Sequence, residues 1–147
     1  MTRRGRFADV WFRAISRIHA GVLRLTRWHV GVAVAGMPIV ELRTRGRRSG
    51  RRRVVVLSAP IVDGDRVVLV ASKGGDDRDP AWYRNLVAHP AVQLTMHGVT
   101  RQMTARTADA AERAELWPRV VASYGGYAAY QRRTAREIPI VICEPRT

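Results

Sequence analysis

The feature that most constrains the fold is a succession of short runs rich in Val and Ile, which begins at Ile39 and continues almost to the end of the chain. β-branched residues favour strands, and short turns containing Gly with Asp or Asn join antiparallel strands as hairpins. Turn signals of this kind occur at Asp63-Gly64-Asp65 and His97-Gly98. We expect strands at Ile39–Thr44, Arg53–Val62, Arg66–Ala71, Val92–Met96, Val99–Arg106 and Ile138–Cys143. Six or so short strands, mostly joined by hairpins, predict an antiparallel barrel decorated by helices.

Helical patterns precede and interrupt these strands. Residues 6–29 repeat apolar side chains at three- and four-residue steps, with arginines over much of the remaining surface, which predicts an amphipathic helix. Asp79-Pro80 supplies an N-cap and a first-turn proline for a helix that ends near Ala88, and we expect a further helix at residues 124–134. Thr107 or Asp109 caps a helix through about Ala122, with a kink or break at Pro118.

Length and composition indicate one folded core. The 147 residues are 46% hydrophobic and contain one cysteine, Cys143, so the core needs no disulfide framework. We expect a mainly β chain of the α+β class, in which residues 1–36 form a basic helix and linker and residues 37–147 form the barrel domain. No continuous apolar segment resembles a secretory signal or a membrane span, which predicts a cytoplasmic protein.

Positive charge is concentrated at the start of the chain. The net charge is +14, and residues 1–53 hold 14 arginines against only Asp9 and Glu41. Such asymmetry predicts an anionic partner: nucleic acid, an acidic membrane surface or a polyanionic ligand. The helix of residues 6–29 would either pack across the barrel or lie on the inner face of the membrane, and the sequence leaves both open.

The densest charge lies between the first two expected strands, where Thr44–Arg53 holds six arginines, two glycines and a serine. Glycine lets backbone N–H groups approach an anion, and guanidinium groups bind phosphate or carboxylate through two parallel hydrogen bonds. A solvated charged hairpin is the alternative. Nucleic-acid binding is disfavoured, because the segment lacks aromatic side chains on which bases could stack.

Three further segments have the residue types of a binding site. Ala71-Ser72-Lys73-Gly74-Gly75 follows a strand and would cradle a ring carbonyl or a phosphate, with an ordinary turn as the alternative. Trp82, Asn85 and Leu86 share one face of the helix after Pro80. Tyr124, Tyr127 and Tyr130 would present a flat wall with hydroxyl groups that can donate to a carbonyl oxygen, and core packing is the alternative for both groups.

Other catalytic chemistries lack their residues. The four histidines have no metal-ligand spacing, so we predict no metal site. There is no Gly-x-Ser-x-Gly motif, and Cys143 lies in an expected strand without an activating partner.

Four segments, taken in order, resemble the deazaflavin-dependent nitroreductase family of actinobacteria. The resemblance runs from about Gly36 to Pro145 and rests on Gly46-Arg47-Arg48-Ser49-Gly50, Ala71-Ser72-Lys73-Gly74-Gly75, Pro80-Ala81-Trp82-Tyr83-Arg84-Asn85-Leu86 and Arg136-Glu137-Ile138-Pro139. It implies a split β-barrel fold, like that of FMN-binding split barrels. It also implies coenzyme F420, a deazaflavin whose tail carries a phosphodiester and an oligoglutamate, and reduction of quinones or nitroaromatic compounds. Hydride chemistry then belongs to the coenzyme, which explains the absence of a catalytic dyad.

The resemblance also implies roles for individual residues. Arg47, Arg48, Ser49 and Arg53 would hold the phosphate and carboxylates, and Tyr127 would touch the deazaflavin. Tyr124 and Tyr130 would face the acceptor and, with Ser72, form the catalytic set. The remaining coenzyme-binding residues implied are Val54, Val55, Val56, Leu57, Ser58, Val70, Ala71, Ser72, Lys73, Ala81, Trp82, Tyr83, Arg84 and Asn85.

The chain departs from the family pattern at four positions. Arg52 and Val56 stand where the family has prolines, Ser58 replaces a tyrosine, and a proline near Gly125 is missing. These changes would lie near the deazaflavin ring. Substrate preference is therefore the family property that is least safely carried over to this chain. Two other readings remain open: a non-enzymatic basic module for acidic lipid or nucleic acid, and a split barrel that binds FMN.

Overall fold

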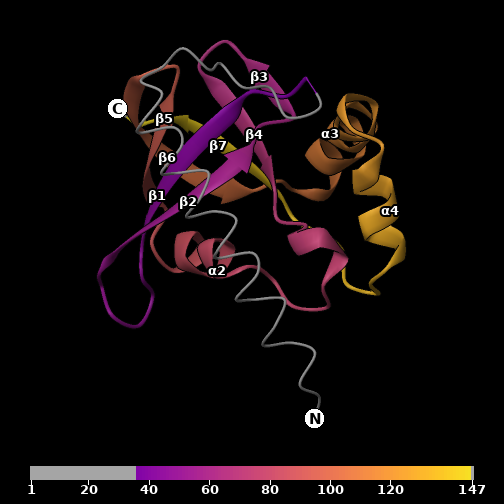
Figure 1. Ribbon diagram of the computed structural model, residues 1–147, viewed down its shortest axis with the longest axis horizontal. Coiled ribbons are helices and arrows are strands. Elements are labelled where there is room, and N and C mark those ends of the chain that lie inside the picture. The colour runs from indigo at the N-terminus through magenta and orange to yellow at the C-terminus, as the bar shows by residue number, and fades with distance from the viewer. Residues whose placement is uncertain (1–35, 147) are drawn as a thin grey trace.

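The computed structural model describes residues 36–146, which form a curved antiparallel sheet with helices at one end and along one face (Figure 1). The helix expected at residues 6–29 lies outside the described residues. The strands are β1 (Ile39–Arg45), β2 (Arg52–Ser58), β3 (Ile61–Asp63), β4 (Arg66–Val70), β5 (Ala91–Met96), β6 (Val99–Thr107) and β7 (Ile140–Pro145). The helices are the 3₁₀ helix η1 (Lys73–Gly75), α2 (Ala81–Ala88), α3 (Ala110–Ser123) and α4 (Gly126–Arg132).

The sheet is a half-barrel of seven antiparallel strands in the order β2-β1-β5-β6-β7-β4-β3. Register pairs run along every neighbouring pair of strands in this order. β2 and β3 are the two edges and do not pair with each other, so the barrel is split at that point. The predicted α+β split barrel is therefore confirmed for the described part of the chain.

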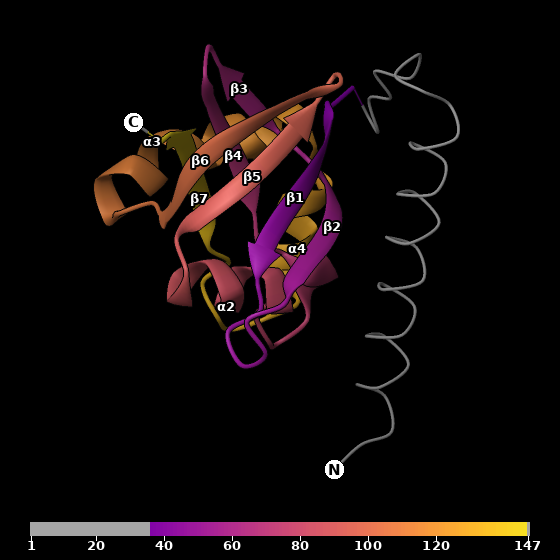
Figure 2. The ribbon, with the colours of Figure 1, turned by 90° about the vertical axis from the view of Figure 1, so that its left-hand side faces the viewer.

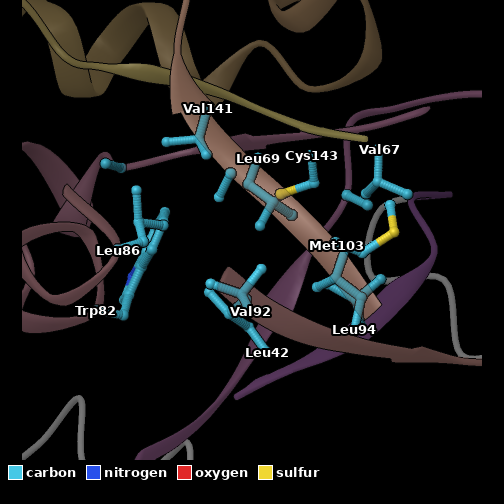
Figure 3. Close-up of a cluster of buried hydrophobic side chains, with 14 residues drawn as sticks. Leu42, Val67, Leu69, Trp82, Leu86, Val92, Leu94, Met103, Val141 and Cys143 are labelled. Carbon is cyan, nitrogen blue, oxygen red and sulfur yellow. The ribbon is translucent and has the colours of Figure 1, made fainter. Parts of the chain in front are cut away.

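The concave side of the half-barrel holds the first hydrophobic core (Figure 3). Alternate side chains of five strands point into it, as the two-residue period of a strand requires. Trp82 and Leu86 of α2 close one end of this core, being 8% and 1% exposed. Its labelled strand residues are Leu42, Val67, Leu69, Val92, Leu94, Met103, Val141 and Cys143.

A second core lies on the opposite face of β4 and β7, under α3 and α4. Leu116 and Val120 of α3 and Tyr127 of α4 pack there against Val68 and Ile142 of the strands. These two strands are therefore covered on both faces, which explains their nearly continuous apolar sequences.

Two expected boundaries were wrong. The run Arg53–Val62 is two strands rather than one, because Pro60 has no N–H to donate to a ladder. The Ala59 N–H bonds instead to the Pro38 carbonyl at 2.8 Å. Asp79 does not cap α2: Pro80 occupies the N-cap position, and the Asp79 carboxylate accepts a hydrogen bond from Arg136 at 3.1 Å.

α3 continues through Pro118 without a break, contrary to expectation. Ala114, whose carbonyl loses its partner at this proline, is exposed, so water can satisfy that carbonyl. Asp109 caps the helix through a capping box with Glu112, as one of the two expected caps. The last strand begins at Ile140, two residues late, because the Ile138 N–H bonds to the Gln131 side chain at 2.9 Å and Pro139 has none.

Candidate active site

The predicted binding segments gather at one end of the half-barrel (Figures 1 and 2). The hairpin between β1 and β2 lies beside α2, and η1 lies between α2 and α4. Segments far apart in the sequence thus lie around one end of the core.

The arginine-rich hairpin, residues Gly46–Arg53, has a fixed turn. The Gly46 N–H bonds to the Arg51 carbonyl and the Gly50 N–H to the Gly46 carbonyl, both at 2.8 Å. Gly50 has a φ of 69°, and a Cβ on Gly46 would lie 2.6 Å from the Ser49 hydroxyl. Ser49 itself accepts a hydrogen bond from the Arg51 N–H at 3.2 Å, so both glycines and the serine shape the turn.

Asn85 of α2 connects this turn to the core. Its side-chain oxygen accepts hydrogen bonds from the Arg47 backbone N–H at 3.1 Å and from the Arg47 guanidinium at 3.2 Å. Its amide nitrogen donates to the Thr44 hydroxyl at 3.3 Å, and both Asn85 and Thr44 are buried. The structure therefore brings Arg47 and Asn85 together and gives Asn85 a positioning role.

The other arginines of the hairpin have no acidic neighbour among the residues that the structure describes. Among residues 36–146 no carboxylate lies within ion-pair distance of Arg48, Arg51 or Arg53, and Arg48 and Arg53 are exposed. Guanidinium groups without a counter-ion on a rigid turn are available to an external anion.

β2 continues from the hairpin as an edge strand with two different faces. Val55 and Leu57 pack against the inner core, while Val54 lies opposite Arg43 and Val56 opposite Glu41 on the outer face. Val54 is 41% exposed, and Ser58 is partly buried near the other end of the strand. The five predicted coenzyme residues of this strand thus divide between its two faces.

The loop after β4 packs against α4. Val70 and Ala71 are buried, and a Cβ on Gly75 would lie 2.7 Å from the Tyr130 carbonyl oxygen. Gly75 has a φ of 84°, so the close approach and the backbone conformation both require glycine. Ser72 and Lys73 are partly exposed beside the tyrosine helix, and Lys73 adopts a positive φ of 46°.

Arg136 organises this loop, a role that the sequence reasoning missed. Its guanidinium donates to the carbonyls of Ala71, Ser72 and Asp76 at 2.8 to 3.3 Å and to the Asp79 carboxylate at 3.1 Å. The side chain is only 15% exposed. Its place in the quoted segment Arg136-Glu137-Ile138-Pro139 was the available signal, but its partners are about 60 residues away in sequence.

The three tyrosines form a cluster of edge-to-face rings with centroids 5.5 to 6.3 Å apart. Tyr127 is 6% exposed, and burial raises its pKa to about 12. Tyr124 is exposed, and a hydrogen bond with Tyr124, together with burial, raises the pKa of Tyr130. The Arg133 guanidinium lies 5.5 Å from the Tyr130 ring centroid and donates to the Gly74 carbonyl, so the cluster adjoins the η1 loop.

The model of one protein family matches residues 15–145 of this chain, with the description "F420H(2)-dependent quinone reductase". The chain belongs to this family. A protein of Mycobacterium tuberculosis named as an F420H(2)-dependent quinone reductase is 35% identical over 134 residues, which are 88% of this chain and 89% of that relative. A second protein of the same organism, for which the same activity has been put forward, is 38% identical over 110 residues, 75% of this chain and 92% of that relative.

A solved structure described as an F420-H2 dependent reductase, FDR-A, is similar in fold and sequence. Its TM-score with this chain is 0.66 at 40% identity, and the match covers 73% of this chain and 94% of that one. The fold and the ordered motifs therefore agree with the family assignment.

For a member of the quinone reductase family, the residues present fit the coenzyme. A phosphodiester and several carboxylates require several cations, and the hairpin presents guanidinium groups that no carboxylate of residues 36–146 pairs with, on a turn fixed by Asn85. The site has no cluster of three or more metal-ligating side chains within residues 36–146. No helix in this part of the chain is long and apolar enough to cross a bilayer.

Among the predicted residues on α2, side chains point in different directions. Trp82 lies in the inner core beside Leu86, whereas Ala81 and Arg84 are exposed. The Tyr83 hydroxyl is hydrogen-bonded to the Thr107 hydroxyl at 2.8 Å, which directs it toward the end of β6. Trp82 therefore packs at the end of the inner core, in agreement with the alternative that this residue is part of the core.

Proposed function

We propose that this chain is an F420H(2)-dependent quinone reductase whose coenzyme binds at the end of the half-barrel between the arginine-rich hairpin and the η1 loop. The observation that carries the proposal is the pairing of two features at that end. One is a rigid turn whose arginines lack carboxylate partners within the described part of the chain, and the other is a loop anchored by Arg136 beside a tyrosine cluster.

The hairpin supplies the affinity. Arg47, Arg48 and Arg53, with Ser49 at the turn, hold the phosphodiester and the nearest carboxylates of the tail. Asn85 fixes the Arg47 backbone and side chain before the ligand arrives, so little conformational freedom is lost on binding. β2 continues directly from the hairpin, so residues 54–58 would pass beneath the ring system.

The loop and the tyrosine cluster orient the reaction. When bound, the reduced coenzyme supplies the hydride. Ser72 and Lys73 border the ring, and Tyr124 and Tyr130 donate hydrogen bonds to the acceptor oxygen. An ordinary tyrosine pKa is near 10, and the surroundings of Tyr130 raise its pKa further, so its hydroxyl stays protonated at neutral pH and acts as a hydrogen-bond donor rather than a base. Tyr127 supports both rings from the second core.

The acceptor class is a quinone, and nitroaromatic compounds are a second class that the same site would reduce. A lipid-soluble quinone would favour a protein at the cytoplasmic face of a membrane, with residues 1–36 as the attachment and residues 37–147 as the reductase domain. Flotation of the full chain with anionic but not with neutral vesicles is the expected result. Equal recovery in both would remove the membrane attachment without affecting the reductase.

A fluorescence titration with oxidised coenzyme F420 tests the proposal directly, followed by menaquinone-analogue reduction with the reduced coenzyme. FMN is the matched control, because it has a single terminal phosphate and would leave most of the hairpin charge unused. Tight binding of F420 with weak or absent binding of FMN is expected. The reverse order of affinities would assign the chain to FMN-binding split barrels instead.

A further inference from the structure

A basic hollow lies on the side of the hairpin away from the inner core. Its volume is about 270 Å³, and it opens on the outer face of β1, β5 and β6. Among the residues that the structure describes, four arginines and no acidic residue line it; the lining residues that matter here are Arg43, Arg45, Arg52, Arg146, Gln93 and Gln102. We call this set the outer basic hollow.

Two of the four arginines are already held in place by protein groups. Arg43 forms an ion pair with Glu41 at 2.8 Å, and the Arg146 guanidinium donates to the Gln102 side-chain oxygen at 2.6 Å. The remaining two, Arg45 and Arg52, face each other directly in the register of β1 and β2. Within residues 36–146 neither has a carboxylate at ion-pair distance.

Like charges directly opposite each other on a sheet destabilise it, and here nothing in the described chain offsets that repulsion. An anion between Arg45 and Arg52 would turn this repulsion into two attractive contacts. The hollow would hold an oxyanion with forked donors on both sides, and the Gln93 and Gln102 side chains add neutral polar groups at its edge.

The register also shows that the hairpin separates two groups of arginines. Arg53 lies opposite the buried Thr44 and so shares the face of the inner core, whereas Arg52 lies opposite Arg45 on the outer face. Gly50 at the tip lines the hollow, and the Arg45 guanidinium nitrogens lie 3.7 Å from the position of a Cβ there. The tip of the turn therefore adjoins the hollow, next to the Arg45 side chain.

We infer that the outer basic hollow binds the distal carboxylates of the oligoglutamate tail of the coenzyme. This inference rests on the proposed function, in which Arg47, Arg48 and Arg53 hold the phosphodiester and the nearest carboxylates. A flexible chain with one carboxylate per unit can follow the hairpin round its tip, and a concave hollow suits a chain better than the flat surface of a bilayer. The affinity for the coenzyme would then depend on the length of its tail, through residues that do not contact the ring.

The test compares coenzyme with a single-glutamate tail and coenzyme with a tail of five or so glutamates, each titrated by fluorescence against wild type and Arg45→Gln/Arg52→Gln. Wild type should bind the long tail about tenfold more tightly, the equivalent of one net charge-assisted contact. The double variant should lose most of that gain and bind the short-tailed form within about twofold of wild type, because its ring and phosphate contacts are intact.

A matched control removes two positive charges elsewhere. Arg101→Gln/Arg119→Gln deletes two arginines that already have carboxylate partners, Asp65 and Asp63, and should retain the tail gain. If this control also lost the tighter binding of the long-tailed coenzyme, that preference would come from long-range attraction to the net charge, and the inference would be overturned. Arg45→Gln/Arg52→Gln should keep or raise its thermal midpoint, since it relieves repulsion.

An equal tail gain in wild type and Arg45→Gln/Arg52→Gln would overturn the inference while leaving binding of the short-tailed coenzyme and the proposed function intact. Absence of binding for either tail length in wild type would overturn both. Loss of flotation on anionic vesicles in the double variant, with the tail gain unchanged, would assign the hollow to a lipid surface and also overturn the inference.

Discussion

The arginines of the hairpin and those of the α3–α4 side occupy opposite electrostatic situations. Arg106, Arg113, Arg119 and Arg136 each have a carboxylate within 3.1 Å, supplied by Glu112, Glu137, Asp63 and Asp79. In the hairpin and at the adjoining end of β1, by contrast, no such partner is found among the described residues for Arg45, Arg48, Arg51, Arg52 and Arg53. The same side chain thus serves two purposes: paired with acids it joins elements of the fold, and unpaired it remains available to an external anion.

The difference teaches where to look for function in an arginine-rich chain. A count of charges does not separate the two groups, because each contains several arginines. The neighbouring residues do separate the two groups. A guanidinium that already donates its hydrogen bonds to protein carboxylates and carbonyls has few N–H groups left to donate to a ligand. The comparison predicts large binding effects and small stability effects in the hairpin, and the reverse on the α3–α4 side.

The largest effect is expected for Arg47→Ala/Arg48→Ala. Each charge-assisted hydrogen bond contributes about 1.5–3 kcal/mol, so loss of two should raise the coenzyme Kd by at least about a hundredfold. The thermal midpoint should change little, although Arg47 loses one bond to Asn85. Fluorescence titration and thermal unfolding measure the two quantities. An unchanged Kd would show that the hairpin does not bind the coenzyme tail.

Tyr130→Phe should act on turnover rather than on coenzyme affinity. It removes one hydroxyl from the cluster and leaves the ring packing against Tyr124 and Tyr127. Loss of one hydrogen bond to the acceptor should lower kcat by about tenfold, with the coenzyme Kd unchanged. Steady-state kinetics with a soluble quinone checks this, and an unaltered kcat would remove Tyr130 from the mechanism.

Arg136→Lys tests an arginine that belongs to both groups by position. Its hydrogen bonds all go to protein groups, yet those bonds hold a loop of the proposed binding site. Lysine keeps the charge but cannot reach the carbonyls of Ala71, Ser72 and Asp76 together. We expect a drop of about 1–3 kcal/mol in stability and a rise of about fivefold in the coenzyme Kd.

Arg113→Lys is the matched control for that variant. Arg113 is similarly buried and binds the Ile138 carbonyl and Glu137 in the same segment, but it does not contact the η1 loop. It should lower the thermal midpoint while the coenzyme Kd stays the same. If both variants changed the Kd equally, Arg136 would be merely one of the residues that stabilise the segment.

Much of the fold could be predicted because it depends on local patterns. The hairpin turns and the alternation of buried residues in β1, β5 and β6 place most strands within two residues of their observed ends. The break in the run Arg53–Val62 follows from Pro60, a signal within the segment that the expectation of one strand overlooked. The displacement of Asp79 from its expected N-cap position depends instead on Arg136, which is distant in the sequence, and the segment around Asp79 does not contain that information.

The sequence predicts which segments form the candidate site, but it does not predict what each residue in them does. The motifs name the hairpin, the η1 loop, α2 and the tyrosines. The structure brings the hairpin, α2 and η1 to one end of the half-barrel, with the tyrosine helix α4 beside η1 on the outer face of β4 and β7. Motifs do not show that Asn85 is buried beneath Arg47, or that Trp82 belongs to the core. They also cannot show that Arg52 and Arg53, adjacent in sequence, face opposite sides of the sheet.

The smallest effect is expected for Arg119→Ala, which removes a paired arginine on the α3 side. Arg119 binds Asp63 at 2.9 Å in an exposed ion pair, and Asp63 keeps a second partner in Arg66. Hydrogen bonds from Arg119 and Arg66 lower the pKa of Asp63 below its usual value of 3.8. A lowered pKa in the folded state stabilises the fold above the unfolded-state pKa, and that stabilisation is lost as pH falls through the lowered value.

The thermal midpoint of Arg119→Ala should therefore fall slightly at pH 7, and the gap to wild type should narrow as the pH falls below 3.8. The coenzyme Kd should not change at any pH. Thermal unfolding at several pH values, with a coenzyme titration of both proteins at pH 7, measures these quantities. A raised Kd here would mean that paired and unpaired arginines contribute alike to binding, and the comparison between the two regions would fail.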